Sequence, residues 1–301
     1  MQPGENITGI ILIQKWLTRL YQNIIINYWV SDQSAMQLAD NFRKFTYVMR
    51  TVKHWQRTTM ELSHWKEDGL RQIELVFKDN QAFHHVTLGT AWAMISYYYW
   101  SHRLKAYDSN DLRELYNTGE EIYAKIREIC KSWPYGGWGL QGTHGILFLV
   151  VRKYKPKIFV ETGIASGYSS TVILKAMKMN GFGQLISIDI QDSVSPCGIQ
   201  KPAGWLVPDT VRDIWTKTIG SSEEKLTELK DPIDAFYHDS EHSEKNMSRE
   251  FNWAAEHLPK GGVLISDDID WNNAWNNFLK GNGSFKKVIE TVSTGMAIKT
   301  P

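Results

Sequence analysis

The sequence predicts an α/β fold built on a parallel sheet, because short apolar runs alternate with helical segments. Each of four such runs in the second half of the chain is followed by a polar or glycine-rich turn and then by a helical pattern. Strands separated by helices in this way pair in parallel and are joined by right-handed crossovers. The four predicted strands are Ile158 to Val160, Leu185 to Ile188, Ala235 to Tyr237 and Val263 to Ile265.

The first half of the chain has a different character. Eight of the 13 Trp and ten of the 13 Tyr precede residue 151, in segments of helical pattern. Glycine, proline and aromatic residues gather from Trp133 to Gly139, a composition typical of a boundary, and a helical run from Thr143 to Tyr154 follows. We therefore expect a helical N-terminal region, residues 1–132, and an α/β domain, residues 133–301.

The aromatic cluster of the N-terminal region, Trp92 and Tyr97 to Trp100, allows three interpretations. It could pack a helical core, form an interface with a second copy of the chain, or cover a substrate as a lid. Packing is the favoured interpretation, because most aromatic side chains serve it. The neighbouring pair His84 and His85 lacks acidic or Cys companions at metal-ligand spacing, so no metal site is predicted there.

Composition excludes several classes of protein. The 301 residues carry 34 basic and 33 acidic side chains, for a net charge of +1, and no long basic run. This balance argues against a protein held to nucleic acid by its phosphates. The apolar stretch from Ile7 to Val30 is interrupted by a polar helical stripe, so it predicts an amphipathic helix that packs on its own chain or in a homo-oligomer rather than a membrane span.

The chain has two cysteines, Cys130 and Cys197, and neither belongs to a CxxC motif. From this we expect no disulfide framework and no cysteine zinc site. A reducing cytoplasm is the expected location.

The first predicted strand leads into Glu161-Thr-Gly-Ile-Ala-Ser-Gly-Tyr-Ser-Ser170. Gly163 and Gly167 allow the backbone to approach a ligand closely, and the helix that begins near Ser169 offers unpaired N–H groups. The turn lacks the glycines of a dinucleotide fingerprint and the lysine of a P-loop. The carboxylate of Glu161 suits a cationic ligand. An ordinary strand-to-helix turn with serine caps is the alternative.

Asp189 ends the second predicted strand, 28 positions after Glu161. An acidic residue there is placed to accept hydrogen bonds from both ribose hydroxyls. Taken singly, such an Asp is more often a turn or cap residue. Combined with the glycine turn, it predicts a nucleoside site.

Acidic residues also follow the next two predicted strands. Asp239 comes after one, and Asp267 and Asp268 come after the other. Carboxylates at one sheet edge repel one another unless protons or a cation neutralise them, and oxygen ligands suit Mg²⁺, Ca²⁺ or Mn²⁺. His242 could act there as a general base, a metal ligand or a helix-start residue. His238 points to the opposite face of its strand and is expected to be structural.

The order of the segments ETGIASGYSS, ISID, IGSSEEKL, DAFYHDSEHS and LPKGGVLISDD resembles the class I S-adenosylmethionine-dependent methyltransferases. Within that class it resembles the metal-dependent O-methyltransferases of the catechol type and their sugar- and antibiotic-modifying relatives. The resemblance covers about residues 138–301. It implies a Rossmann-like, mostly parallel sheet of seven strands with helices on both faces.

The resemblance also implies roles for individual residues. His242 and Asp239 would be catalytic, and the metal, most simply Mg²⁺, would be held by Asp239, Asp267 and Asp268. The catechol type commonly has Asn at the position of Asp268, and the sugar-modifying relatives have His at the position of His242. Residues implied to surround S-adenosylmethionine are Glu161, Gly163, Gly167, Tyr168, Ser169, Asp189, Ser221 and Ser222, with Asp189 at the ribose and the last two at the adenine.

The predicted function is therefore metal-assisted O-methylation of a small molecule such as a diol, a catechol or a sugar. In this mechanism, a divalent ion orients two acceptor oxygens while His242 removes a proton. Two alternatives are open. The His and carboxylate cluster has the ligand types of an iron hydroxylase, and the chain could also be a cofactor-binding module without turnover.

Overall fold

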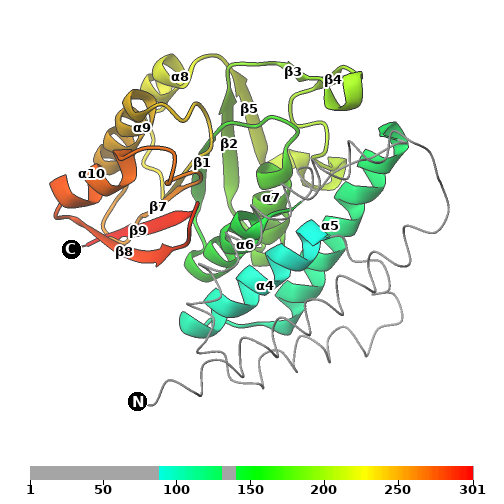
Figure 1. Cartoon of the computed structure of the whole chain (residues 1–301), viewed down its shortest axis with the longest axis horizontal. Coiled ribbons are helices and arrows are strands. Elements are labelled where there is room, and N and C mark those ends of the chain that lie inside the picture. Colours follow the sequence, from blue (N-terminus) through cyan, green and yellow to red (C-terminus); the bar gives the residue numbers. More distant parts are fainter. Residues whose placement is uncertain (1–87, 131–139, 301) are drawn as a thin grey trace, which may run out of the picture. The chain divides into compact units, whose positions relative to one another are not determined.

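The computed structural model describes residues 88–130 and 140–300, all of which belong to one compact unit, Val86–Pro301 (Figure 1). Several predictions lie outside the described residues: the amphipathic helix from Ile7 to Val30, the His84–His85 pair and the boundary segment from Trp133 to Gly139.

A sheet of seven strands forms the centre of this unit, in the order β5-β2-β1-β6-β7-β9-β8. The first five strands of that order are parallel, and β9 runs antiparallel to β7 and β8. The predicted mostly parallel, Rossmann-like sheet is confirmed. The strands are β1 Ile158–Thr162, β2 Gln184–Asp189, β5 Trp215–Ile219, β6 Ala235–His238, β7 Val263–Ser266, β8 Phe285–Glu290 and β9 Gly295–Lys299; β3 Ser193–Val194 and β4 Lys201–Pro202 form a separate pair.

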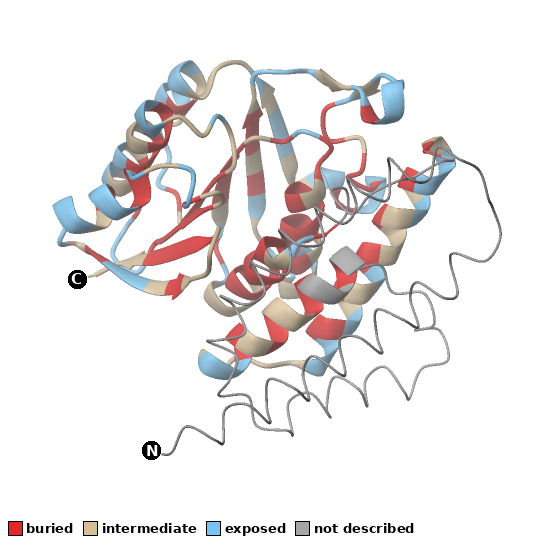
Figure 2. Ribbon diagram, in the orientation of Figure 1, coloured by how far each residue is buried: buried red, intermediate tan, exposed pale blue. Residues whose placement is uncertain are grey.

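Helices cover both faces of the sheet, and the central strands are therefore buried, as Figure 2 shows. Every residue of β6 and β7 is buried, which explains their continuous apolar sequences. One face carries α8 Ser222–Glu228, α9 Glu244–His257 and α10 Ala274–Gly281 (Figure 1). The other carries α6 Gly142–Tyr154 and α7 Tyr168–Asn180, with α4 Leu88–Arg103 and α5 Ser109–Ile129 packed outside them.

The outer helices α4 and α5 are joined to the inner layer by packing and by buried polar contacts. Tyr97 of α4 donates a hydrogen bond to Asp111 of α5 over 2.7 Å, and Arg152 of α6 contacts the other Asp111 oxygen, also at 2.7 Å. Tyr97, Tyr98 and Trp100 are buried in this layer, in line with the packing interpretation. The predicted boundary between residues 132 and 133 therefore falls inside the compact unit, because α4 and α5 find their partners on α6 and α7.

Cys130 and Cys197 form a disulfide, with their Cα atoms 5.7 Å apart, so the prediction that the chain has no disulfide is wrong. Cys130 follows α5, and Cys197 lies in a short 3₁₀ helix, Pro196–Gly198, between β2 and β5. The two residues are 67 positions apart in the sequence, so only the fold brings them together. A motif such as CxxC indicates a pair of cysteines that are close in the sequence. It cannot indicate a pair separated by 67 positions.

Reduction of this disulfide is expected to destabilise the unit. In the chain-entropy model, opening a loop of 67 residues costs about 4 kcal/mol of unfolding free energy. Urea unfolding with and without a dithiol reductant measures the difference. The Cys197→Ser variant should match the reduced wild type and be insensitive to the reductant; equal midpoints for oxidised and reduced wild type would contradict the prediction.

Across the described residues, no helix has the length and apolar character needed to span a membrane.

Candidate active site

The carboxyl ends of the five parallel strands lie along one edge of the sheet, the edge at which ligands bind in open α/β folds. The topology brings nearly all of the predicted site residues to this edge. In sheet order, the residues at or just after the strand ends are Ser221 (β5), Asp189 (β2), Gly163 (β1), Asp239 (β6) and Asp267 (β7). A cofactor turn on β1 is thereby placed directly beside the acidic cluster that follows β6 and β7.

The glycine turn after β1 makes two close backbone approaches. Gly163 and Gly167 both have φ of 90°, a left-handed conformation that favours glycine. A Cβ on Gly163 would lie 1.9 Å from the carbonyl oxygen of Asp239, and one on Gly167 would lie 2.9 Å from the Cα of Gly204. The sequence analysis assigned these glycines to ligand approach. In the structure, they also allow the turn to pack against its neighbouring loops.

Glu161 lies wholly inside the protein, beneath the glycine turn. Its carboxylate accepts hydrogen bonds from the hydroxyls of Ser169, of Ser170 at 2.6 Å and of Ser187 at 2.7 Å. Burial raises its pKa, and the three hydroxyls oppose that rise. Glu161 and Ser169 therefore join β1 to the first turn of α7, and the Glu161 carboxylate has no exposed surface.

Asp189 holds the glycine turn from the side of β2. Its Oδ2 accepts hydrogen bonds from the amides of Ile164 at 2.7 Å and Ala165 at 2.9 Å, and its Oδ1 accepts from the amide of Gln191 at 2.9 Å. The main-chain oxygen of Asp189 accepts from the amide of Gly220, which links this site to the turn after β5. Asp189 thus ends β2 and lies between the turns after β1 and β5, and its role at a ribose stays a prediction.

Ser221 and Ser222 begin α8 after β5. The hydroxyl of Ser221 accepts a hydrogen bond from the amide of Glu224 at 3.2 Å, as an N-cap does. The hydroxyl of Ser222 accepts one from Arg249 at 3.0 Å. Both serines, which are predicted to line the adenine pocket, therefore already have hydrogen-bond partners within the protein.

The N-terminus of α7 presents hydrogen-bond donors at the glycine turn. Its N-cap is Gly167, which has no side chain to satisfy the first amides of the helix. The hydroxyl of Tyr168 is buried and has no hydrogen-bond partner among the described residues. An amide-lined helix end with an unsatisfied hydroxyl beside it fits a carboxylate such as that of an amino acid moiety.

The acidic cluster after β6 and β7 surrounds an imidazole. The Nε2 of His242 lies 3.3 Å from Oδ2 of Asp268 and 3.8 Å from Oδ1 of Asp239. The side chains of Asp239 and Asp268 keep 34% and 31% of their surface exposed, so both remain accessible to a ligand at the sheet edge. The predicted partners Asp239, His242 and Asp268 are therefore in contact.

Desolvation and mutual repulsion shift the pKa values of this cluster. The pKa of Asp239 lies well above its usual value, because of desolvation and the negative charges of Asp267 and Glu161. Desolvation and the charge of Asp267 raise the pKa of Asp268 to about 6. Desolvation, together with the nearby His238, lowers the pKa of His242 to about 4, so its imidazole is neutral near pH 7.

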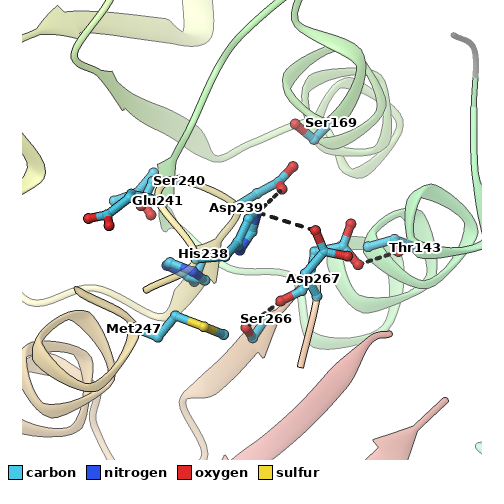
Figure 3. Close-up of polar contacts among 12 residues, drawn as sticks. Thr143, Ser169, His238, Asp239, Ser240, Glu241, Met247, Ser266 and Asp267 are labelled. Atoms are coloured by element: carbon cyan, nitrogen blue, oxygen red, sulfur yellow. Dashed lines mark hydrogen bonds and ion pairs between the residues drawn. The ribbon is translucent and has the colours of Figure 1, made fainter. Parts of the chain in front are cut away.

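Thr143 and Thr294 hold Asp267 and were missed by the sequence analysis. The Oδ1 of Asp267 accepts hydrogen bonds from the hydroxyls of Thr143 at 3.0 Å and Thr294 at 3.3 Å. Figure 3 shows Thr143 reaching Asp267 from the helix beside the sheet. These threonines are 124 and 27 positions away from Asp267, and no local motif marks them.

A third missed residue, Glu250 of α9, supports the strand that precedes Asp239. Its Oε2 lies 2.7 Å from Nδ1 of His238 and accepts a hydrogen bond from Thr162 at 2.6 Å. His238 and Glu250 are fully buried, as expected of the structural role predicted for His238. The ring of His238 in turn packs against His242, with centroids 5.3 Å apart.

The described residues contain no group of three His, Cys, Asp or Glu side chains gathered closely enough to hold a metal ion. The donor chemistry at the sheet edge nevertheless suits a hard cation. Asp239, Asp267 and Asp268 offer only oxygen atoms, and the pKa of each is raised, in part by neighbouring negative charges that a cation would offset.

Two comparisons relate the chain to known proteins. Residues 160–269 match a family model described as a methyltransferase domain. No curated protein shows significant similarity to the chain. Similar solved structures include an O-methyltransferase, TomG, from Streptomyces achromogenes (16% identity, 71% of this chain and 100% of that chain, TM-score 0.47) and an O-methyltransferase from Bacillus cereus (16% identity, 70% and 99%, TM-score 0.46).

The matched residues run from β1 to the loop after β7 and include the glycine turn, Asp189 and the acidic cluster. They therefore contain the carboxyl ends of all five parallel strands, whereas Thr143 and Thr294 lie outside the matched residues. Residues 160–269 of this chain thus resemble a methyltransferase domain and lie within the mostly parallel, Rossmann-like sheet.

Proposed function

We propose that the protein is an S-adenosylmethionine-dependent O-methyltransferase that acts on a hydroxyl group of a small molecule. The observation that carries this proposal is the adjacency of two sites on neighbouring strands. The turn at Gly163 packs against the backbone of Asp239, and the carboxylate of Asp239 lies 3.8 Å from the imidazole of His242. A methyl donor held on β1 would therefore face a proton acceptor held on β6.

The cofactor is proposed to lie along the turns after β1, β2 and β5. The N-terminus of α7 and the hydroxyl of Tyr168 would bind its carboxylate. Asp189 accepts two amides at Oδ2 and one at Oδ1, so one lone pair of Oδ1 remains to accept a ribose hydroxyl. Bound S-adenosylmethionine supplies an activated methyl group on a positively charged sulfur.

His242 is proposed to act as the general base. The hydroxyl proton of the acceptor would pass to Nε2 of His242 as the acceptor oxygen bonds to the methyl carbon and the carbon–sulfur bond breaks, which leaves the cofactor as a neutral thioether. The imidazolium that forms would lie within 4 Å of the carboxylates of Asp268 and Asp239. These carboxylates stabilise the new positive charge. His238, packed behind His242, fixes the orientation of the ring.

We also propose that the protein uses a divalent cation. Asp239, Asp267 and Asp268 would hold it, and it would orient the acceptor and lower the pKa of its hydroxyl. The supporting observation is the raised pKa of all three carboxyl groups. Thr143 and Thr294 would then keep Asp267 in position, as they do in the structure.

The cofactor claim is tested by titrating S-adenosylmethionine into the protein by calorimetry. We expect saturable binding that weakens by roughly 10- to 100-fold in Asp189→Ala, because the ribose loses its acceptor and the amides of the turn lose theirs. Asp192→Asn, an exposed change in the same connection, is the control and should bind as wild type does. Undetectable binding by the wild type would refute the proposal.

The cation claim is tested by thermal unfolding of the EDTA-treated protein. Adding millimolar Mg²⁺ should raise the melting temperature of the wild type, because a ligand that binds only the folded state stabilises it. It should leave that of Asp268→Ala unchanged. In parallel, EDTA should abolish methyl transfer while cofactor binding persists. Full turnover in EDTA, or the same response to Mg²⁺ in both proteins, would remove the metal from the mechanism.

A further inference from the structure

The Cys130–Cys197 disulfide ties a helix to the segment that borders the proposed cofactor site. Cys130 follows α5, and Cys197 lies in the connection between β2 and β5, residues 190–214. The regular structure of this β2–β5 connection consists of two 3₁₀ helices and the two-residue strands β3 and β4 (Figure 1). A covalent bond to α5 therefore fixes a segment that has little secondary structure to hold it in place.

The β2–β5 connection lies against the glycine turn. It starts directly after Asp189, the proposed ribose acid. Beyond β4, the amide of Gly204 donates a hydrogen bond to the carbonyl of Ala165 at 2.9 Å. The amide of Leu206 donates to the carbonyl of Ser166 at 3.1 Å. The backbone proposed to face the cofactor is thus supported from the connection, so the order of one depends on the order of the other.

The disulfide also holds part of the connection in an unfavourable conformation. Cys197 has φ of 53° and ψ of 30°, a left-handed backbone that is disfavoured for a residue with a Cβ. Once the bond is opened, this residue can relax. One noncovalent contact, from Nζ of Lys125 to the carbonyl of Leu206 at 3.1 Å, would still join α5 to the connection.

A reductant can reach the bond from the side of Cys197, because that residue is exposed, whereas Cys130 keeps only 4% of its surface. A thiolate of a dithiol attacks the sulfur of Cys197, and the sulfur of Cys130 leaves as a thiolate. The second thiol of the reductant then attacks the mixed disulfide and releases Cys197. The reductant becomes a cyclic disulfide, and the protein gains two electrons and two protons as two thiols. The sequence has no third cysteine to capture either thiol.

We propose that the Cys130–Cys197 disulfide is a redox switch for cofactor binding. When the bond is closed, the β2–β5 connection is held against the glycine turn and the site is ready to bind. When a dithiol opens the bond, the connection samples more conformations, and binding must first order it, which lowers the affinity. This inference rests on the proposed function and adds the regulation of the same site.

The experiment measures the binding of S-adenosylhomocysteine to the full chain in both redox states by equilibrium dialysis. Alkylation with iodoacetamide followed by mass measurement counts the thiols, which should number none in the oxidised protein and two after dithiothreitol treatment. We expect the affinity to fall roughly tenfold on reduction and to recover when the bond is allowed to form again. Cys197→Ser should bind as weakly as the reduced wild type and should not respond to dithiothreitol.

Phe278→Ala separates local loosening from a general loss of stability. It removes a buried ring from α10, on the opposite face of the sheet from α5, and so destabilises the same unit at a distance from the connection. This variant should bind S-adenosylhomocysteine like the wild type at a temperature at which circular dichroism shows both to be folded. Hydrogen exchange at the amides of Gly204 and Leu206 should accelerate in the reduced wild type and stay unchanged in Phe278→Ala.

Several results would overturn the inference while the proposed function stands. These are equal affinity of the oxidised and reduced wild type, tighter binding after reduction, or two free thiols in the oxidised protein. A Phe278→Ala variant that loses as much affinity as the reduced wild type would also overturn it, because the effect would then follow from stability alone. If the oxidised wild type does not bind S-adenosylhomocysteine, the proposed function itself is refuted, and the inference with it.

Discussion

Asp239→Asn is expected to lower methyl transfer by roughly 10²- to 10⁴-fold while making the protein more stable. Activity falls because the carboxylate that faces His242 and the proposed cation is lost. Stability rises because Asp239 is partly desolvated and is repelled by Asp267 and Glu161, whereas the amide of Asn has a similar shape and no charge. Solvent screens part of this repulsion, because 34% of the Asp239 side chain is exposed, so we expect a gain of no more than about 1 kcal/mol.

The gain should depend on pH in a defined direction. The pKa of Asp239 is raised on folding, so between its unfolded and folded pKa values the folded protein binds more protons than the unfolded chain. Wild-type stability therefore falls as pH rises through this window, and Asp239→Asn removes that loss. Melting temperatures of the metal-free proteins should be similar near pH 4 and diverge toward pH 8.

Asp270→Asn is the matched control, since it removes one negative charge from an exposed side chain near the same sheet edge. Its stability should lie within about 0.5 kcal/mol of wild type, and its turnover should be retained. A destabilised Asp239→Asn, or one that turns over normally, would show that Asp239 is a packing residue.

Gly163→Ala is expected to destabilise the protein by about 3 kcal/mol or more and to reduce activity at the same time. A left-handed backbone costs an alanine about 1–2 kcal/mol. In addition, the new Cβ would lie 1.9 Å from the carbonyl oxygen of Asp239, so one of the two backbones must move. That movement would separate the cofactor turn from the acidic cluster. Urea unfolding and a methyl-transfer assay measure both effects.

Gly181→Ala separates the two causes. Gly181 is also left-handed, with φ of 78°, but a Cβ there would meet no atom within 4 Å. This variant should lose only the conformational contribution, about 1–2 kcal/mol, and remain active. Equal losses of stability in the two variants would show that contact with Asp239 contributes nothing at Gly163.

The sheet could be predicted because its signal is local. Strands β1, β2, β6 and β7 bury apolar runs between helices, and such runs are visible in the sequence without knowledge of their partners. The positions of Asp189, Asp239 and Asp267 follow from the same argument, because residues that end parallel strands meet at one edge. The sequence predicted only that His242 and Asp268 lie at the same edge of the sheet. The distance of 3.3 Å between Nε2 of His242 and Oδ2 of Asp268 comes from the structure.

Other features depend on contacts between distant segments. The pairing of Cys130 with Cys197, the support of Asp267 by Thr143 and the union of α4 and α5 with α6 each join residues that lie far apart in the chain. The inward orientation of Glu161 depends on Ser187, which comes from the neighbouring strand. No periodicity or short motif records such contacts.

By itself, the sequence determined the α/β class, the glycine turn after the first strand and the set of acidic residues at the strand ends, because hydrophobic periodicity and turn chemistry act over a few residues. The tertiary structure alone decided which oxygens remain available at the edge: those of Glu161 are enclosed by serines, whereas Asp239 and Asp268 are accessible and lie around His242. The physical reason is that burial and charge repulsion are properties of neighbours in space, and the crossovers of the sheet bring those neighbours together.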